Sequence, residues 1–77
     1  MRYPDGQLAK LGDEVNLAGM FGKVVCSIDT GEYSDAHSEK DWAYLLKGVM
    51  IDWDKMGLTH YEQPEAGMTL VRRSEPT

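Results

Sequence analysis

Residues 47–62 read KGVMIDWDKMGLTHYE and predict two antiparallel strands joined by a short turn. Val49, Ile51 and Trp53 recur at every second position, which is the period of a half-buried strand. The turn that follows contains an aspartate suited to accepting backbone hydrogen bonds and Gly57, which tolerates a left-handed backbone. Because a hairpin alone is marginal in water, the rest of the chain must cover its apolar face.

The length and composition of the chain indicate one small folded domain that spans residues 1–77. Of the 77 residues, 42% are apolar, which fits a globule rather than a disordered tail. The eight glycines favour many tight turns and therefore strands over long helices. We expect a mainly β domain of modest stability.

The distribution of apolar residues and the single cysteine, Cys26, predict a cytoplasmic protein. No apolar run approaches the roughly 20 residues of a membrane span, and residues 1–10 lack the apolar core of a secretory signal. One cysteine cannot form an internal disulfide, which fits a reducing compartment. We therefore expect no membrane contact.

Apolar alternation and glycine turns predict five strands in total. Within the longest of them, Val24, Cys26 and Ile28 should share one face, and Val25 and Ser27 the other. The predicted strands lie near residues 14–17, 22–29, 48–53, 58–62 and 68–72.

Residues 29–47, here called the excursion, break the strand pattern. A serine followed three residues later by an aspartate predicts a short helix at residues 38–46. Trp42 and Leu46 lie one helical turn apart, so the helix would carry only a narrow apolar stripe. A helix of about two turns is not stable alone, and we expect Trp42 to pin it to the sheet.

The order of these elements predicts an all-β fold, a small five-stranded antiparallel SH3-like barrel with one short helix in a long loop. The pattern GDxV at residues 12–15, followed by GxVV at residues 22–25, is similar to the first hairpin of many such barrels. This pattern says nothing about activity. Residues 73–77 are expected to fray.

The net charge of −5 is concentrated in one third of the chain. Residues 29–54 contain seven acidic residues and two lysines, whereas the other residues balance six acids against six bases. An acidic chain argues against nucleic acid as a partner, because basic patches neutralise phosphates. The acidic segment is either a solvated, solubilising loop or an electrostatic surface for a basic protein.

The residues able to carry chemistry are scattered along the chain. Cys26, His37 and His60 occur without the spacing of metal ligands, so neither a metal nor another cofactor is expected. Cys26 should pack as a small apolar residue, and no pattern places it beside His60 for thiol catalysis. We expect no enzymatic activity, although a small ligand-binding or enzyme barrel that uses His60 or Cys26 remains an alternative.

Five blocks of sequence carry a resemblance to a known family: YPDG at 3–6, LGDxV at 11–15, VVCSIDTGEYS at 24–34, WAYL at 42–45 and GLxHYE at 57–62. With them the chain resembles, over nearly its whole length, a family of small, largely uncharacterised bacterial proteins similar to immunity partners of secreted antibacterial toxins. The resemblance implies a cytoplasmic inhibitor that binds the active surface of a toxin and has no chemistry of its own.

The acids and aromatic residues of the excursion are the candidate binding surface. A tyrosine beside carboxylates is a common composition of protein interfaces. Trp42 and Trp53 are more easily explained as packing residues. A regulatory or structural barrel that binds a peptide or self-associates as a homodimer through an edge strand is the alternative. The candidate partner-binding residues are Asp29, Glu32, Tyr33, Asp35, Glu39 and Asp41.

Overall fold

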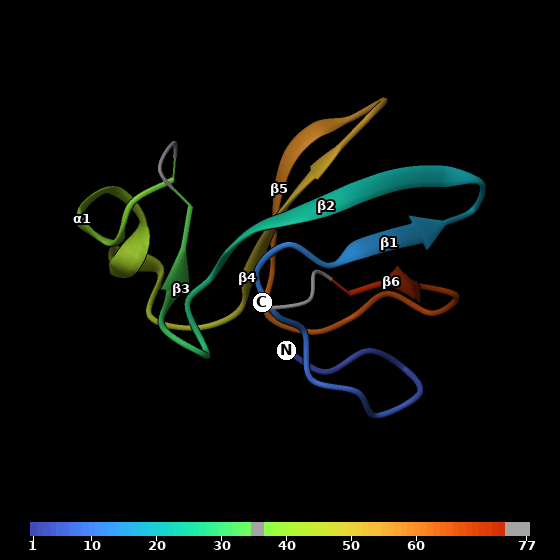
Figure 1. Ribbon diagram of the computed structural model, residues 1–77, viewed down its shortest axis with the longest axis horizontal. Helices are drawn as coiled ribbons and strands as arrows, with labels where there is room; N and C mark the ends of the chain where they lie inside the picture. Colours follow the sequence, from blue (N-terminus) through green and yellow to red (C-terminus); the bar gives the residue numbers. More distant parts are fainter. Residues whose placement is uncertain (35–36, 74–77) are drawn as a thin grey trace.

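The computed structural model describes residues 1–34 and 37–73, which form one antiparallel sheet with a short helical segment at its side (Figure 1). The strand order is β5-β4-β2-β1-β6, and β3 pairs with β2 beside this path. In chain order the elements are β1 (Glu14–Leu17), β2 (Met20–Ser27), β3 (Glu32–Tyr33), the helix α1 (Glu39–Trp42), the 3₁₀ turn η1 (Ala43–Leu45), β4 (Val49–Trp53), β5 (Gly57–Tyr61) and β6 (Thr69–Arg72).

The prediction of a mainly antiparallel β fold with one short helix is confirmed, but the number of strands was wrong. The sixth strand is β3, a two-residue element inside the excursion that pairs with the end of β2. Strand β2 is the centre of the sheet, because β4 pairs with it along one edge and β1 and β3 along the other. Among the described residues, β5 and β6 are not paired with each other, so the sheet has two edges.

A β-bulge at Val25 changes which side chains of β2 face the core. Val24 pairs with Ile51 and Cys26 pairs with Met50, so Val25 is an extra residue with no partner on β4. Ile51 belongs to the core, and its neighbour Met50 must point to the opposite face. Our prediction that Cys26 shares a face with Val24 was therefore wrong, whereas its burial is confirmed.

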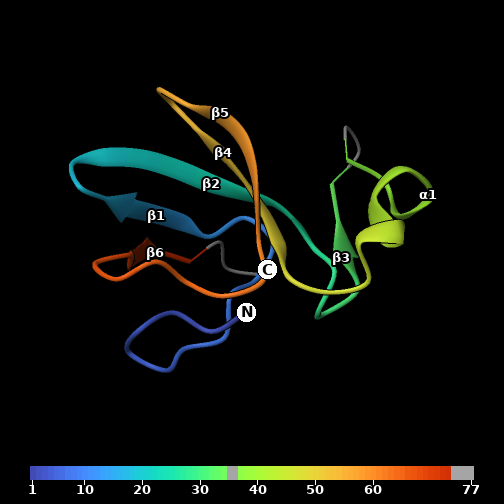
Figure 2. The ribbon, with the colours of Figure 1, turned by 180° about the vertical axis from the view of Figure 1, so that it is seen from behind.

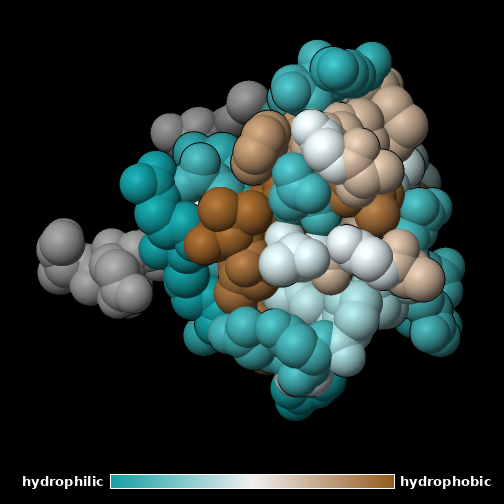
Figure 3. Space-filling view, turned by 90° about the vertical axis from the view of Figure 1, so that its right-hand side faces the viewer, coloured by the Kyte–Doolittle hydropathy of each residue, from teal (hydrophilic) through white to brown (hydrophobic). Residues whose placement is uncertain are grey.

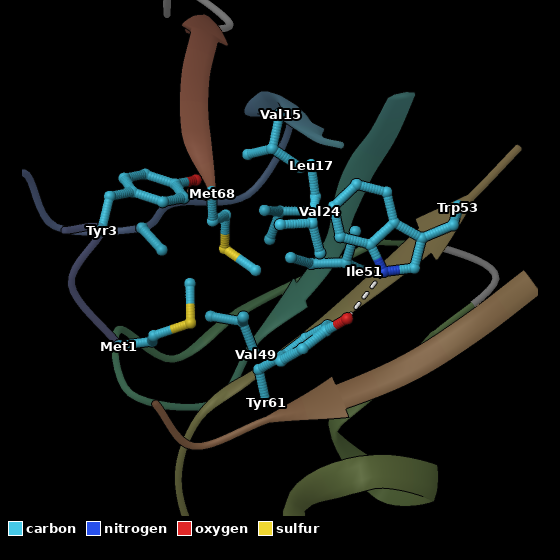
Figure 4. Packing of buried hydrophobic residues seen from close by; sticks show 11 residues of the cluster. Met1, Tyr3, Val15, Leu17, Val24, Val49, Ile51, Trp53, Tyr61 and Met68 are labelled. Atoms are coloured by element: carbon cyan, nitrogen blue, oxygen red, sulfur yellow. Dashed lines mark hydrogen bonds between the residues drawn. The ribbon is translucent and has the colours of Figure 1, made fainter. Parts of the chain in front are cut away.

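Trp53 is the largest fully buried side chain, and Figure 4 shows it at one side of the core cluster, next to Ile51 and Tyr61. Its indole Nε1 donates a hydrogen bond of 3.1 Å to the Tyr61 hydroxyl, and the two rings meet edge to face. On β2, a Cβ atom at Gly22 would lie 2.5 Å from Cε3 of Trp53, so only glycine leaves room for the indole. The prediction that Trp53 fills the core is confirmed.

The first residues of the chain close one end of the core through the buried carboxylate of Asp13. This carboxylate accepts hydrogen bonds from the Tyr3 hydroxyl at 2.7 Å and from the Lys10 amide at 2.9 Å. It also forms an ion pair with Arg73, whose Nε lies 3.1 Å from Oδ1. Arg73 is thus held against the N-terminal segment rather than frayed as expected, and the rest of the expected tail, residues 74–77, lies outside the described residues.

Candidate functional site

The excursion leaves the sheet through a neck made by Asp29 and Gly48. Oδ1 of Asp29 accepts a 2.9 Å hydrogen bond from the Gly48 amide, and the Gly48 carbonyl accepts one of 2.9 Å from the Ile28 amide. Gly48 has a φ of +94°, and a Cβ there would collide with the Tyr61 carbonyl. The neck therefore requires both a glycine and a carboxylate, and it fixes where the excursion begins and ends.

Asp29 is thus occupied inside the molecule rather than offered to a partner. Its second oxygen accepts a hydrogen bond from the terminal amino group of Met1. Burial alone would raise the pKa of the Asp29 carboxyl, but the Gly48 amide and the amino group outweigh burial and lower it. The charge of Asp29 stabilises the neck, which makes this residue a poor candidate for docking.

Glu32 and Tyr33 are also turned towards their own chain. Oε1 of Glu32 accepts hydrogen bonds from the Leu11 amide at 3.3 Å and from the Thr30 hydroxyl at 2.5 Å. Tyr33 is half-buried on β3, where it pairs with Cys26, and burial raises the pKa of its hydroxyl. These two residues join the excursion to the sheet and present little of themselves to a partner.

Two of the predicted binding residues, Glu39 and Asp41, are exposed on α1. Ser38 is the N-cap of this helix as predicted, but its hydroxyl donates to the Asp41 carboxylate at 3.2 Å instead of capping the backbone. The structure thus brings Glu39 and Asp41 to the same exposed turn, away from Asp29 and Glu32. The remaining candidate, Asp35, lies outside the described residues.

Contrary to our expectation, α1 is not pinned to the sheet by Trp42. Neither α1 nor η1 contains a buried residue, and Figures 1 and 2 show the excursion standing to one side of the sheet. Trp42 is half-buried and its ring lies 6.1 Å from that of His37 and 6.5 Å from that of Tyr44. Its aromatic neighbours come from the excursion itself, which therefore forms a small projecting unit.

Tyr44 and Leu46 are exposed binding candidates that were not among the partner-binding residues predicted from the sequence. Their exposed fractions are 71% and 82%, although both residue types usually seek burial. Leu46 also has a φ of +71°, a left-handed conformation that is strained for a leucine. Helical spacing from Trp42 suggested that Leu46 faces inward, but α1 gives way to the tighter η1 before Leu46 is reached.

The alternative site at Cys26 and His60 is not assembled for thiol chemistry. Pairing places Tyr33, Cys26, Met50 and His60 in one row across four strands, on the face opposite the core. Cys26 and His60 are therefore two strands apart, roughly 10 Å, with Met50 between them. His60 Nε2 instead lies 2.8 Å from the Lys47 carbonyl, and burial raises the pKa of the Cys26 thiol, which disfavours the reactive thiolate.

A shallow, open depression lies on the outer face of β1, β2 and β4, away from the excursion. Neither Cys26 nor His60 lines it, so it does not support the ligand-binding alternative built on these residues. The residues that line the depression are Glu14, Phe21, Gly22, Lys23, Asp52, Trp53 and Asp54.

Within residues 1–34 and 37–73, no group of three His, Cys, Asp or Glu side chains could hold a metal ion.

Comparison with known proteins adds no relative to this chain. No protein-family model, curated protein or solved structure matches it. The resemblance to bacterial immunity proteins therefore stays a prediction. In the part of the chain that the structure describes, no helix has the length and apolar character needed to cross a membrane.

Proposed function

We propose that this protein is a non-enzymatic binding module, an immunity-type inhibitor of the bacterial cytoplasm that docks a basic protein partner through its excursion. One observation carries the proposal: Tyr44 and Leu46 are exposed beside the exposed acids Glu39 and Asp41, on a projecting segment. An aromatic or aliphatic anchor inside a charged rim is the usual composition of a protein interface.

Leu46 gives the proposal its energetic argument. Leaving a leucine in water forgoes roughly 1.5–3 kcal/mol of burial, and its left-handed backbone adds a cost of about 1–2 kcal/mol. A fold that tolerates both costs at one residue has a candidate functional position there, because strained backbone is concentrated at binding and catalytic sites. Docking would bury the Leu46 side chain and recover part of this energy.

Charge determines the class of partner that we propose. Residues 29–54 carry a net charge of −5, and within them Asp29 and Glu32 are engaged in the neck and the sheet. Glu39 and Asp41 remain exposed and would meet lysine or arginine side chains of the partner. If the partner is a nuclease-like toxin, these carboxylates would occupy the groove that otherwise binds phosphates.

We also propose that residues 1–77 form one domain and that its sheet is an open form of an SH3-like barrel. Support comes from the strand order, in which β6 returns to pair with β1 beside a four-strand meander. The bulges in β2 and at Val71 bend the sheet in the way that closure would require. The scaffold would hold the neck rigid while the excursion carries the binding residues.

The test is calorimetric titration of the protein against the purified product of each neighbouring gene, at low and moderate salt. We expect one neighbour to bind, with an affinity that weakens as salt rises. Glu39→Lys should weaken this binding, because the substituted side chain would repel the basic partner. Glu65→Lys is the matched control, since Glu65 is also exposed but lies outside the excursion.

Two results would contradict the proposal. If no product of a neighbouring gene binds, the hypothesis of an immunity-type inhibitor is wrong. If binding occurs but Glu39→Lys and Glu65→Lys weaken it equally, general charge rather than the excursion determines the affinity.

A further inference from the structure

The two edges of the sheet are protected to different degrees. Strand β6 has only four residues, a bulge at Val71 where its register with β1 shifts, and Arg72 on the edge. Strand β5 has five residues, pairs with β4 without a register shift, and contains no lysine, arginine, proline or acid. Bulges and charged residues are the devices by which proteins prevent edge strands from pairing with other chains.

Strand β5 therefore presents unpaired backbone groups without such protection. It pairs with β4 on one side, and within the described residues no strand lies on its other side. The side chains near this edge add apolar area, because Leu58 on its outer face is 39% exposed and Met56 of the turn is 55% exposed. Hydrophobic side chains also reach the surface at the end that carries the β1–β2 turn, where Figure 3 shows them grouped between hydrophilic ones.

We propose that β5 pairs antiparallel with β5 of a second copy of this chain, centred on Thr59. This register uses all five residues of the strand and brings Thr59 opposite Thr59 of the second copy. Leu58 then lies opposite His60 of the second copy, both on the outer face. Opposed threonines are a favourable cross-strand pair.

The distribution of charge favours a second copy in this orientation. Tyr61, at the end of β5, pairs with Val49 just after the neck of the excursion, whereas Gly57 lies at the far turn of the hairpin. Antiparallel pairing therefore places the two excursions at opposite ends of the new ribbon. Their negative charges are kept apart, and β5 itself brings no charge to the contact.

The test is sedimentation velocity of the full chain from low micromolar to near-millimolar concentration, with variants at Thr59. The unmodified protein should pass from monomer to dimer as concentration rises. Thr59→Lys should raise the dimer dissociation constant by about tenfold or more, because two lysines would face each other at the symmetry axis. Thr59→Val should leave the dissociation constant unchanged or lower it, since a β-branched side chain is kept.

Thr69→Lys on β6 is the matched control, because Thr69 is exposed at the other edge and the substitution is the same. It should leave the dissociation constant unchanged. Hydrogen exchange of the unmodified protein gives a second measurement that depends on no variant: β5 amides should become more protected as concentration rises, and β6 amides should not.

A protein that stays monomeric up to near-millimolar concentration would overturn the proposal. So would a dimer that Thr69→Lys weakens as strongly as Thr59→Lys does, provided that circular dichroism shows both variants folded. Concentration-dependent protection at β6 instead of β5 would also overturn it.

Discussion

The sheet and the excursion each contain a Trp–Tyr pair, and they use it in opposite ways. In the sheet, Trp53 and Tyr61 meet edge to face at 6.3 Å, are joined by a hydrogen bond, and are buried. In the excursion, the rings of Trp42 and Tyr44 lie 6.5 Å apart and only 23° from parallel, and Tyr44 is largely in solvent. The same residue types thus serve packing in one region and remain accessible in the other.

The difference arises from what surrounds each pair. Trp53 lies on a strand whose neighbours alternate in period two, so four strands supply apolar side chains around it. Trp42 lies on a single helical turn that buries none of its residues, and its aromatic neighbours belong to its own segment. An aromatic side chain becomes a core residue when the elements around it have a common apolar face, and the excursion has none.

Removing each tryptophan tests this comparison with the largest expected effect. Trp53→Ala should lower the free energy of unfolding by about 3–5 kcal/mol, a large part of the stability of a small domain. Trp42→Ala should cost only about 1 kcal/mol, because a half-buried aromatic pair is lost without a core cavity. Urea unfolding followed by circular dichroism measures both. Similar losses in the two variants would show that the excursion packs as firmly as the sheet.

Gly22→Ala should be the next largest effect, because its Cβ would lie 2.5 Å from the ring of Trp53 and 2.8 Å from Cγ2 of Ile51. Forcing such an overlap into a packed core costs about 1–3 kcal/mol. The glycine has an ordinary backbone conformation, so the cost is one of space alone. In a double-mutant cycle with Trp53→Phe, the penalty should shrink since the smaller ring leaves room. Strict additivity of the two losses would contradict this explanation.

Local patterns predicted the sheet well and its irregularities poorly. Alternation in β4 and β5 located the hairpin, because the core side chains recur there at period two. The bulge at Val25 left no local signal, since one extra residue in a run of apolar side chains keeps the run apolar. Which face Cys26 occupies depends on its partner on β4, and the sequence of β2 alone does not determine how it pairs with a distant strand.

The candidate site was predicted only where exposure follows from local sequence. Glu39 and Asp41 are exposed because they lie on a polar turn, as their neighbours suggested. Asp29 accepts a hydrogen bond from Gly48, 19 residues away, and Glu32 accepts one from Leu11, 21 residues away, so contacts distant in sequence decide that both are engaged within the fold. Clustered acids in a sequence therefore do not distinguish carboxylates that hold a fold together from those that face solvent.

Acid unfolding separates these two kinds of carboxylate. The folded-state pKa of Asp29 lies below its ordinary value of 3.8, so its charge contributes stability that is present above about pH 4 and is lost as pH falls further. Asp29→Asn should therefore cost about 1 kcal/mol at neutral pH and make stability less dependent on acid. Asp41→Asn is the comparison on the exposed turn and should leave the stability at neutral pH nearly unchanged. Denaturant midpoints measured from pH 7 to pH 2 follow the stability of both variants. The same loss of stability in the two would contradict the distinction between the two kinds of carboxylate.

The smallest expected effect on stability concerns the two residues other than glycine that have positive φ in the described chain, Ala18 and Leu46. Glycine relieves a left-handed backbone but adds entropy to the unfolded state, so replacing either residue with glycine should change the free energy of unfolding by no more than about 1 kcal/mol. Ala18 lies in the β1–β2 turn and Leu46 in the excursion, which makes the two substitutions a matched pair across the two regions.

Binding should separate this pair although stability does not. Leu46→Gly removes an exposed side chain that we propose as an anchor, so its affinity for the neighbouring gene product should fall by about tenfold, the loss typical of an anchor residue. Ala18→Gly should leave that affinity unchanged, because the backbone change is the same and the excursion is intact. Calorimetry gives the affinities and urea unfolding the stabilities. A Leu46→Gly variant that loses several kcal/mol of stability would show that the Leu46 side chain is packed in solution. The excursion would then bury its apolar residues as the sheet does.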